Sequence, residues 1–262
     1  MKLKLYQVDA FTDKVFSGNP AAVVPLESWL NDDLLQKIAM ENNLAETAYY
    51  VKNGDAYDIR WFTPTIEVDL CGHATLASAY VLFNYQNHPG NIVKFHSRRS
   101  GQLSVEREGN LLKLNFPTDV YNRVEVSLEL KACVDKTPLE AYKGKTDFML
   151  VFNSEREIRG LKPSFDEISK LSARGLIVTA PGDSVDFVSR FFGPQSGINE
   201  DPVTGSAHTT LTPYWSKRLD KKELTAMQLS PRVGHLKCKF LNDRVEISGN
   251  GKEYLIGDIF IE

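Results

Sequence analysis

The same order of predicted elements runs twice along the 262-residue sequence. Each half begins with alternating strands, continues through a short amphipathic helix and further strands, and then reaches a glycine turn before a helix rich in small residues. The two turns stand in "CGHATLASA" and "TGSAHTTLT", at Gly72 and Gly205. A chain of this length suits one large domain or two compact ones, and the repetition favours two copies of one α+β unit.

Local patterns define the elements of each copy. Strands are predicted where β-branched and aromatic residues alternate, as in "KLKLYQVDAF", "AYDIRWF", "VEVSLELKACV" and "DFMLVFN". Short amphipathic helices follow Asn31 and Ser164, both good helix caps. The helix after Gly72 is apolar almost all round, which is typical of a buried helix and suggests a closed or nearly closed sheet around it. The join near Pro117 predicts an N-terminal lobe over 1–117 and a C-terminal lobe over 118–252.

Composition excludes several classes of protein. With 31 basic and 34 acidic side chains the formal net charge is −3, and no basic run predicts a nucleic-acid surface. The N-terminus lacks the apolar core and cleavage site of a signal peptide, and no segment has the length of a membrane span. We therefore expect a cytosolic protein that binds neither nucleic acid nor membranes.

Metal and nucleotide motifs are missing. The three cysteines, Cys71, Cys133 and Cys238, are far apart in sequence and form no C-x-x-C pair, so reduced thiols are expected rather than disulfides or a zinc site. No G-x-G-x-x-G follows a strand, and "YKGKTD" lacks the first glycine of a phosphate-binding loop. The sequence predicts no metal and no nicotinamide, flavin or ATP.

The glycine turns are the first candidates for function. Gly72 and Gly205 each precede small residues, which leave the N–H groups at a helix start accessible to an anion. One such turn is more often only a tight beginning to a helix, but two matching turns could converge on one cleft. His73 and His208 lie at these helix starts, where the dipole favours a neutral ring. Either histidine alone is more often structural.

Acidic residues near the turns are the candidate proton carriers. A carboxylate in a dry cleft beside a helix N-terminus can act as base and then as acid on a carbon-bound proton. For any single acid, capping or solvation is the more common role, and spacing does not rank Glu46 above Glu41. The candidates are Glu41, Glu46, Glu67, Asp69, Glu200 and Asp201.

Several long motifs together closely resemble the PhzF-like family, named for an isomerase of phenazine biosynthesis. The resemblance extends over nearly the whole chain and rests on "QVDAFTDKVFSGNPAAVV", "NNLAETAYY", "RWFTPTIEVDLCGHATLASAYVLF", "FFGPQSGINEDPVTGSAHTTLTPYW" and "QLSPRVG". It implies the diaminopimelate epimerase-like fold, with two pseudo-symmetric lobes, each a barrel-like, mostly antiparallel sheet around a central helix. The active site would lie between the lobes, and the final strand, about 253–262, would return to the first lobe.

The resemblance also implies a chemistry. The phenazine isomerase moves a proton between ring carbons of a dihydro-hydroxyanthranilate without a cofactor. Its principal acid/base corresponds to Glu46, assisted by His73 and Asp201. The substrate carboxylate would be bound by the turns, and the implied binding residues are Asn19, Gly72, Gly205 and Ser206. A homodimer and a small carboxylate-bearing substrate are further implications.

Two alternatives remain open from the residues. An epimerase or racemase could use Cys71 as one base, but the position of the second thiol in such enzymes corresponds to Thr204, whose hydroxyl is too weakly acidic to replace it. A binding protein could keep the cleft without catalysis. Because fold and acid/base set do not define the bound molecule, the physiological substrate is left undetermined.

Overall fold

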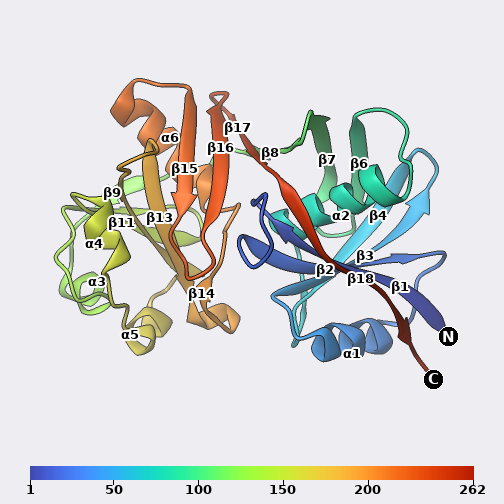
Figure 1. Ribbon diagram of the computed structural model, residues 1–262. Helices are drawn as coiled ribbons and strands as arrows, with labels where there is room; N and C mark the ends of the chain where they lie inside the picture. Colours follow the sequence, from blue (N-terminus) through green and yellow to red (C-terminus); the bar gives the residue numbers. More distant parts are fainter. The chain divides into compact units, whose positions relative to one another are not determined.

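The computed structural model describes residues 1–262, which fold into two compact units of the α+β class. Unit 1 comprises residues 1–115 and 248–262, and unit 2 comprises 116–247. Both chain ends lie together in unit 1, where the Ile261 N–H donates to the Met1 carbonyl at 2.8 Å (Figure 1). No helix of either unit is both long enough and apolar enough to cross a membrane.

Unit 1 is built on one mixed sheet. Its strands pair in the order β18-β1-β2-β3-β4-β6-β7-β8, with the short β5 also on β4. Only the β2–β3 and β4–β6 pairs are parallel. The strands are β1 (Lys2–Ala10), β2 (Asn19–Leu26), β3 (Glu46–Asn53), β4 (Ala56–Phe62), β5 (Glu67–Val68), β6 (Ile92–Ser97), β7 (Gly101–Glu108), β8 (Leu111–Pro117) and β18 (Gly251–Phe260).

Helices α1 (Asp32–Asn42) and α2 (Gly72–Tyr85) pack against this sheet (Figure 1). Helix α2 packs against β1, β2 and β3, and it is buried over most of its length, as its apolar sequence predicts. Helix α1 is amphipathic and buries Leu35, Ile38 and Ala39. Its cap is confirmed, because the Asn31 side chain accepts a hydrogen bond from the Leu34 N–H at 2.8 Å.

Unit 2 repeats the strand pairing of unit 1. Its order is β9-β10-β11-β12-β13-β15-β16, with β14 also on β13, and the parallel pairs β11–β12 and β13–β15 stand at the equivalent places. The repeated pairing agrees with the repetition read from the sequence. The strands are β9 (Asn122–Val124), β10 (Glu140–Lys143), β11 (Asp147–Val151), β12 (Gly175–Pro181), β13 (Phe187–Gly193), β14 (Ile198–Asp201), β15 (Glu223–Gln228), β16 (Gly234–Phe240) and β17 (Arg244–Gly249).

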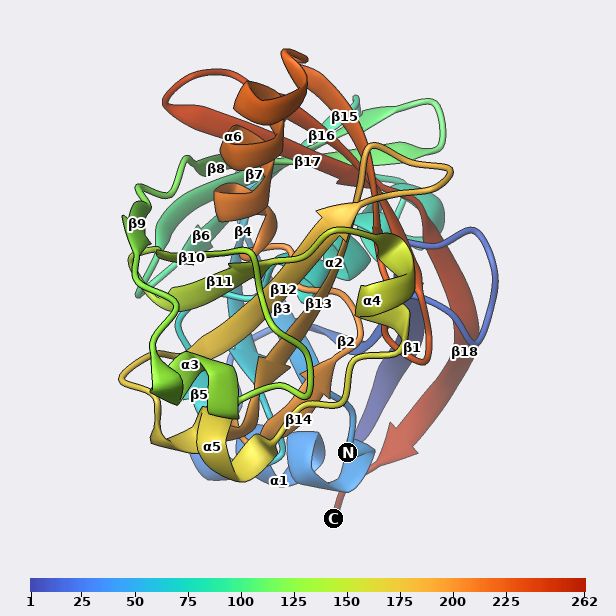
Figure 2. The same cartoon turned by 90° about the vertical axis from the view of Figure 1, so that its left-hand side faces the viewer.

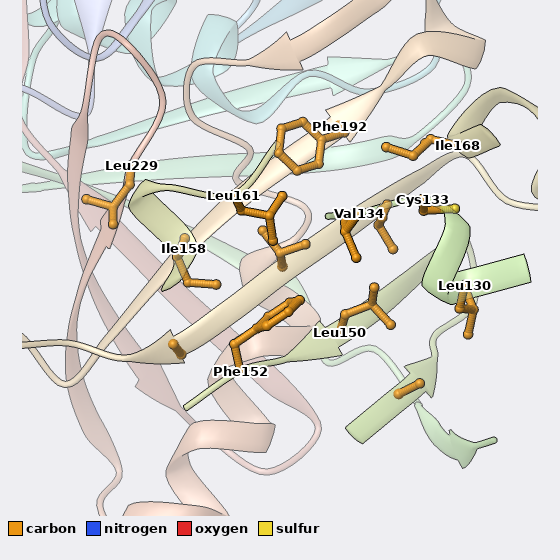
Figure 3. Packing of buried hydrophobic residues seen from close by; sticks show 14 of the residues in the cluster. Leu130, Cys133, Val134, Leu150, Phe152, Ile158, Leu161, Ile168, Phe192 and Leu229 are labelled. Atoms are coloured by element: carbon orange, nitrogen blue, oxygen red, sulfur yellow. The ribbon is translucent and has the colours of Figure 1, made fainter. Parts of the chain in front are cut away.

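Short helices cover the sheet of unit 2. Helices α4 (Glu155–Arg159) and α5 (Phe165–Lys170) pack on β12 and β13 (Figure 2). The core beneath them includes Phe152, Ile158 and Phe192 (Figure 3). A short 3₁₀ helix (Pro194–Ser196) joins β13 to β14.

One strand prediction in unit 2 is wrong. The segment "VEVSLELKACV" contains helix α3 (Leu128–Ala132), although its alternation is typical of a strand. The Ser127 side chain accepts from the Leu130 N–H at 3.3 Å and starts a helical turn that the alternation conceals. Helix α4 was not predicted either, although it begins with a capping box between Ser154 and Glu157, whose S-x-x-E spacing is a sequence signature of a helix start.

Helix α6 (His208–Leu219) is the buried helix of unit 2 and contains Pro213. Proline has no N–H, so the Thr209 carbonyl loses its usual partner within the helix. That carbonyl instead accepts from the Asp119 N–H at 3.2 Å. Trp215 stacks on Phe187 with ring centroids 5.8 Å apart, which fixes the helix against β13.

Candidate active site

Glu46 and Asn19 lie near each other because they begin neighbouring parallel strands. Asn19 is the first residue of β2 and Glu46 the first of β3, and Ala21 is in register with Glu46. The turn before β2 depends on Gly18, whose φ is +65°. A Cβ there would lie 2.1 Å from the Ala10 carbonyl oxygen, so the turn that positions Asn19 requires glycine.

Cys71 and His73 are held by the first turn of α2. Cys71 is the N-cap residue, and its carbonyl accepts from the Thr75 N–H at 3.1 Å and from the Thr75 hydroxyl at 2.6 Å. Gly72 is the first helical residue, as the sequence predicts. The N–H groups of the first turn have no acceptor within the helix, so they are donors suited to an anion.

The side chains of these elements form one buried cluster. Glu46 Oε2 lies 3.1 Å from His73 Nε2, which is an ion-pair distance. On the other side of the ring, His73 Nδ1 lies 3.2 Å from Asn19 Nδ2 and 3.5 Å from Cys71 Sγ. Asn19, Cys71 and His73 are buried, whereas the Glu46 side chain keeps 13% exposure. Glu46 is therefore the most exposed side chain of the cluster, although its Oε2 atom, which faces His73, is buried.

The sequence predicts a neutral His73 ring, but the surroundings of the ring favour its protonated form. Burial alone would lower the pKa of His73, but the Cys71 sulfur and the Glu46 carboxylate raise this pKa well above its ordinary value. Burial raises the pKa of Cys71 to about 11, and the charge of Glu46 acts in the same direction. Because the Cys71 thiol is then protonated near neutral pH, Glu46 is the anion that favours imidazolium.

In unit 2 the predicted residues gather around a second turn. The Thr204 hydroxyl donates to Asp201 Oδ2 at 2.5 Å. The buried Gln228 fixes the segment between them, since its Oε1 accepts from the Thr204 N–H at 2.8 Å and its Nε2 donates to the Asp201 carbonyl at 2.7 Å. Sequence reasoning missed Gln228, because a lone glutamine at the end of a strand carries no motif.

Gly205 does not open a helix directly, which corrects the sequence expectation. Residues 205–207 form a tight turn in which the His208 N–H donates to the Gly205 carbonyl at 3.0 Å, and α6 begins only at His208. The Ser206 hydroxyl accepts from Arg174 Nη1 at 2.9 Å, and the same guanidinium makes a bidentate pair with Asp147. Arg174 is a second contact that the sequence did not reveal.

His208 has a structural position. It is fully buried, its ring lies 5.9 Å from that of Phe187, and its Nδ1 is 2.9 Å from the Thr204 carbonyl. Because a carbonyl only accepts, Nδ1 carries the proton. Burial lowers the pKa of His208 to about 4, so its ring is neutral near pH 7.

The structure separates Glu46 from the other acidic candidates of unit 1. Glu41 is exposed on α1, and Asp69 is exposed and pairs with Arg99 at 2.9 Å. Glu67 makes a bidentate pair with the buried Arg60, at 2.7 and 2.8 Å. Glu41 is therefore a solvated surface acid, whereas Asp69 and Glu67 are each paired with an arginine.

In unit 2 the neighbouring acid also has a structural partner. Glu200 makes a bidentate pair with Arg190, at 2.7 and 2.9 Å. Asp201 is therefore the acid of this segment whose carboxylate accepts a hydrogen bond from the Thr204 hydroxyl, beside Gly205.

The site holds groups suited to acid/base chemistry, and comparison with known proteins shows the family. A buried carboxylate–imidazole pair beside a helix start is an arrangement that can exchange protons with a bound molecule. The family model described as "Phenazine biosynthesis-like protein" matches residues 8–254. The chain therefore belongs to the phenazine biosynthesis-like protein family, a family of the isomerase type.

Individual relatives place the chain more closely. It is 50% identical over 251 residues to an uncharacterized isomerase of Pseudomonas aeruginosa, covering 95% of each chain. A crystal structure of a PhzF-family protein of Enterococcus faecalis is 47% identical, with a TM-score of 0.97 over 100% of both chains. A hydroxyproline epimerase of Agrobacterium vitis shares the fold, with a TM-score of 0.64, 10% identity and coverage of 98% and 92%.

Proposed function

We propose that this protein is a cofactor-independent isomerase in which Glu46 carries the proton. Its carboxylate would remove a proton from a carbon near a substrate carboxylate and return it to another carbon. In the first step the C–H bond breaks, the Glu46 O–H bond forms, and the electron pair enters the π system of the substrate. In the second step the Glu46 proton is delivered to the other carbon.

One observation supports this assignment above the others: Glu46 Oε2 lies 3.1 Å from His73 Nε2 in a site that is largely buried. A carboxylate removed from most of the solvent, with one cationic partner, is suited to exchange a proton with carbon. His73 would orient Glu46 and stabilise its negative charge. Asp201 is proposed to assist the transfer, as the resemblance implies.

The proposed substrate is a small molecule that carries a carboxylate. Free N–H groups at Gly72 and His73 support this choice, since a helix N-terminus favours a negative charge. Asn19, Gly205 and Ser206 are proposed as further contacts. The cytosolic location also stays a proposal, supported by three free cysteines.

Solvent isotope exchange tests the proposal. The protein is incubated in D₂O with a dihydro-hydroxyanthranilate and with a panel of small carboxylic acids, and deuterium on carbon is measured by mass spectrometry. Glu46→Gln is expected to lower incorporation by at least about 100-fold, the usual scale of general acid/base catalysis, while the fold is kept. The exposed Glu41→Gln is the matched control and is expected to exchange like the parent protein. Equal exchange by Glu46→Gln would refute the role of Glu46.

The racemase alternative is favoured by the contact of Cys71 Sγ with the His73 ring, at 3.5 Å from Nδ1 and 3.9 Å from Nε2. The buried thiol, with its pKa raised to about 11, is a poor base at neutral pH. Cys71→Ser is therefore expected to keep most of the exchange activity. Loss of exchange in Cys71→Ser, with Glu46→Gln active, would favour the thiol. A binding protein without catalysis would bind one of the acids but incorporate no deuterium.

A further inference from the structure

The cluster of unit 1 contains three side chains of the kinds that bind zinc. Glu46 supplies a carboxylate oxygen, Cys71 a sulfur and His73 a ring nitrogen, and these atoms all lie within 4.8 Å of one another. His73 Nε2 lies 3.1 Å from Glu46 Oε2 and 3.9 Å from Cys71 Sγ. In a tetrahedral zinc site, with bonds of about 2.0–2.3 Å, neighbouring donor atoms stand roughly 3.3–3.6 Å apart. Small side-chain adjustments would bring all three atoms to those separations.

The surroundings of the cluster suit a bound metal ion. Cys71 is the N-cap residue of α2 and His73 lies in its first turn, while Glu46 is the first residue of β3. The Asn19 side-chain amide lies 3.2 Å from Nδ1 of the His73 ring, through its nitrogen. With zinc on Nε2 the ring proton stays on Nδ1, so the Asn19 amide must turn its oxygen to that position to accept the proton. The partly exposed Glu46 side chain gives the ion access to the site.

The donor set selects the type of ion. Sulfur and imidazole nitrogen favour zinc and similar soft or borderline cations, whereas magnesium and calcium prefer oxygen ligands. Three protein ligands leave the fourth tetrahedral position for water. The positive end of α2 disfavours a cation, but the negative charges of the Glu46 carboxylate and of a zinc-bound Cys71 thiolate oppose that effect.

We propose that Glu46, Cys71 and His73 form a site for Zn²⁺, and that the bound ion inhibits the enzyme. The inhibitory part rests on the proposed function, because a Glu46 carboxylate bound to zinc cannot exchange a proton with substrate carbon. Binding displaces the Cys71 thiol proton and any proton on His73 Nε2, and both protons pass to water. Zinc affinity therefore rises with pH. The sequence predicts no metal because short metal-binding motifs are missing, whereas Glu46 stands 25 and 27 positions before Cys71 and His73.

Metal binding is tested on the full chain after treatment with a chelator. Zn²⁺ is titrated by calorimetry, and Co²⁺ serves as an absorbing probe whose charge-transfer band reports thiolate ligation. One ion per chain and a thiolate–cobalt band are expected. Cys71→Ser is expected to lose the band and to bind Zn²⁺ at least about 100-fold more weakly, since even partners outside the ligand set change affinity 10–100-fold. Cys238→Ser, at a buried free cysteine of unit 2, is the matched control and should bind like the parent.

The outcomes separate this proposal from the proposed function. Zn²⁺ binding that is absent, or that persists unchanged in Cys71→Ser, overturns the metal site and leaves the isotope-exchange test of Glu46 unaffected. If Cys71→Ser does not fold, absence of the cobalt band in the parent protein overturns the site by itself. Zinc that binds with the predicted dependence on Cys71, yet leaves deuterium incorporation unchanged, overturns the inhibitory role, whereas the role of Glu46 as proton carrier is decided by the exchange of Glu46→Gln alone.

Discussion

Acidification should destabilise unit 2 through His208. The ring is fully buried, and burial lowers its pKa from 6.5 to about 4. Between these values the unfolded chain binds a proton that the folded chain does not, so stability falls as the pH falls. A difference of about 2.5 pKa units corresponds to about 3.5 kcal/mol at roughly 1.4 kcal/mol per unit, and about 3 kcal/mol of it is lost between pH 7 and 4. The contribution is complete above about pH 6.5 and is lost by about pH 4.

The assay compares urea unfolding at several pH values between 4 and 7 for the parent and for His208→Asn, whose amide can still donate to the Thr204 carbonyl. The variant should be less stable at pH 7, because it is smaller, and its stability should fall less on acidification by about 3 kcal/mol. The exposed His235→Asn is the control and should follow the parent. Parallel pH profiles for the parent and His208→Asn would refute the reasoning.

Further predictions concern both turns. His73, whose pKa is raised, should contribute stability that is complete below about pH 6.5 and is lost as pH rises through its higher folded-state pKa. An NMR titration of the folded protein should show the raised pKa of His73. Glu46→Gln should move this titration of His73 to lower pH. Gln228→Met leaves the Thr204 N–H and the Asp201 carbonyl without this partner and should cost about 2–4 kcal/mol in chemical unfolding. Gln195→Met, in an exposed turn, should cost less than about 1.5 kcal/mol, and equal losses would contradict the assigned role of Gln228. The predicted homodimer is tested by analytical ultracentrifugation, where a species of one-chain mass at micromolar concentration would contradict it.

The regular parts of the fold were predictable because their signals are local. The Asn31 cap, the apolar helix after Gly72 and most strands follow from neighbouring residues alone. The wrong assignment at α3 has the same origin, since its five residues are too few for helical periodicity to outweigh an alternating pattern. The shift of the second helix start from Gly205 to His208 depends on hydrogen bonds of one tight turn, which composition does not encode.

The sequence by itself determined the duplicated α+β architecture and the set of candidate residues, because hydrophobic period, caps and motifs act along the chain. The tertiary structure decided which candidates meet. Spacing did not rank Glu46 above Glu41 or Glu67. The family resemblance singled it out, and the physical reason appeared only when the start of β3 was seen beside the first turn of α2. The charge of His73 was decided in the same way, because a pKa depends on burial and on charges a few ångströms away in space, whatever their separation in sequence.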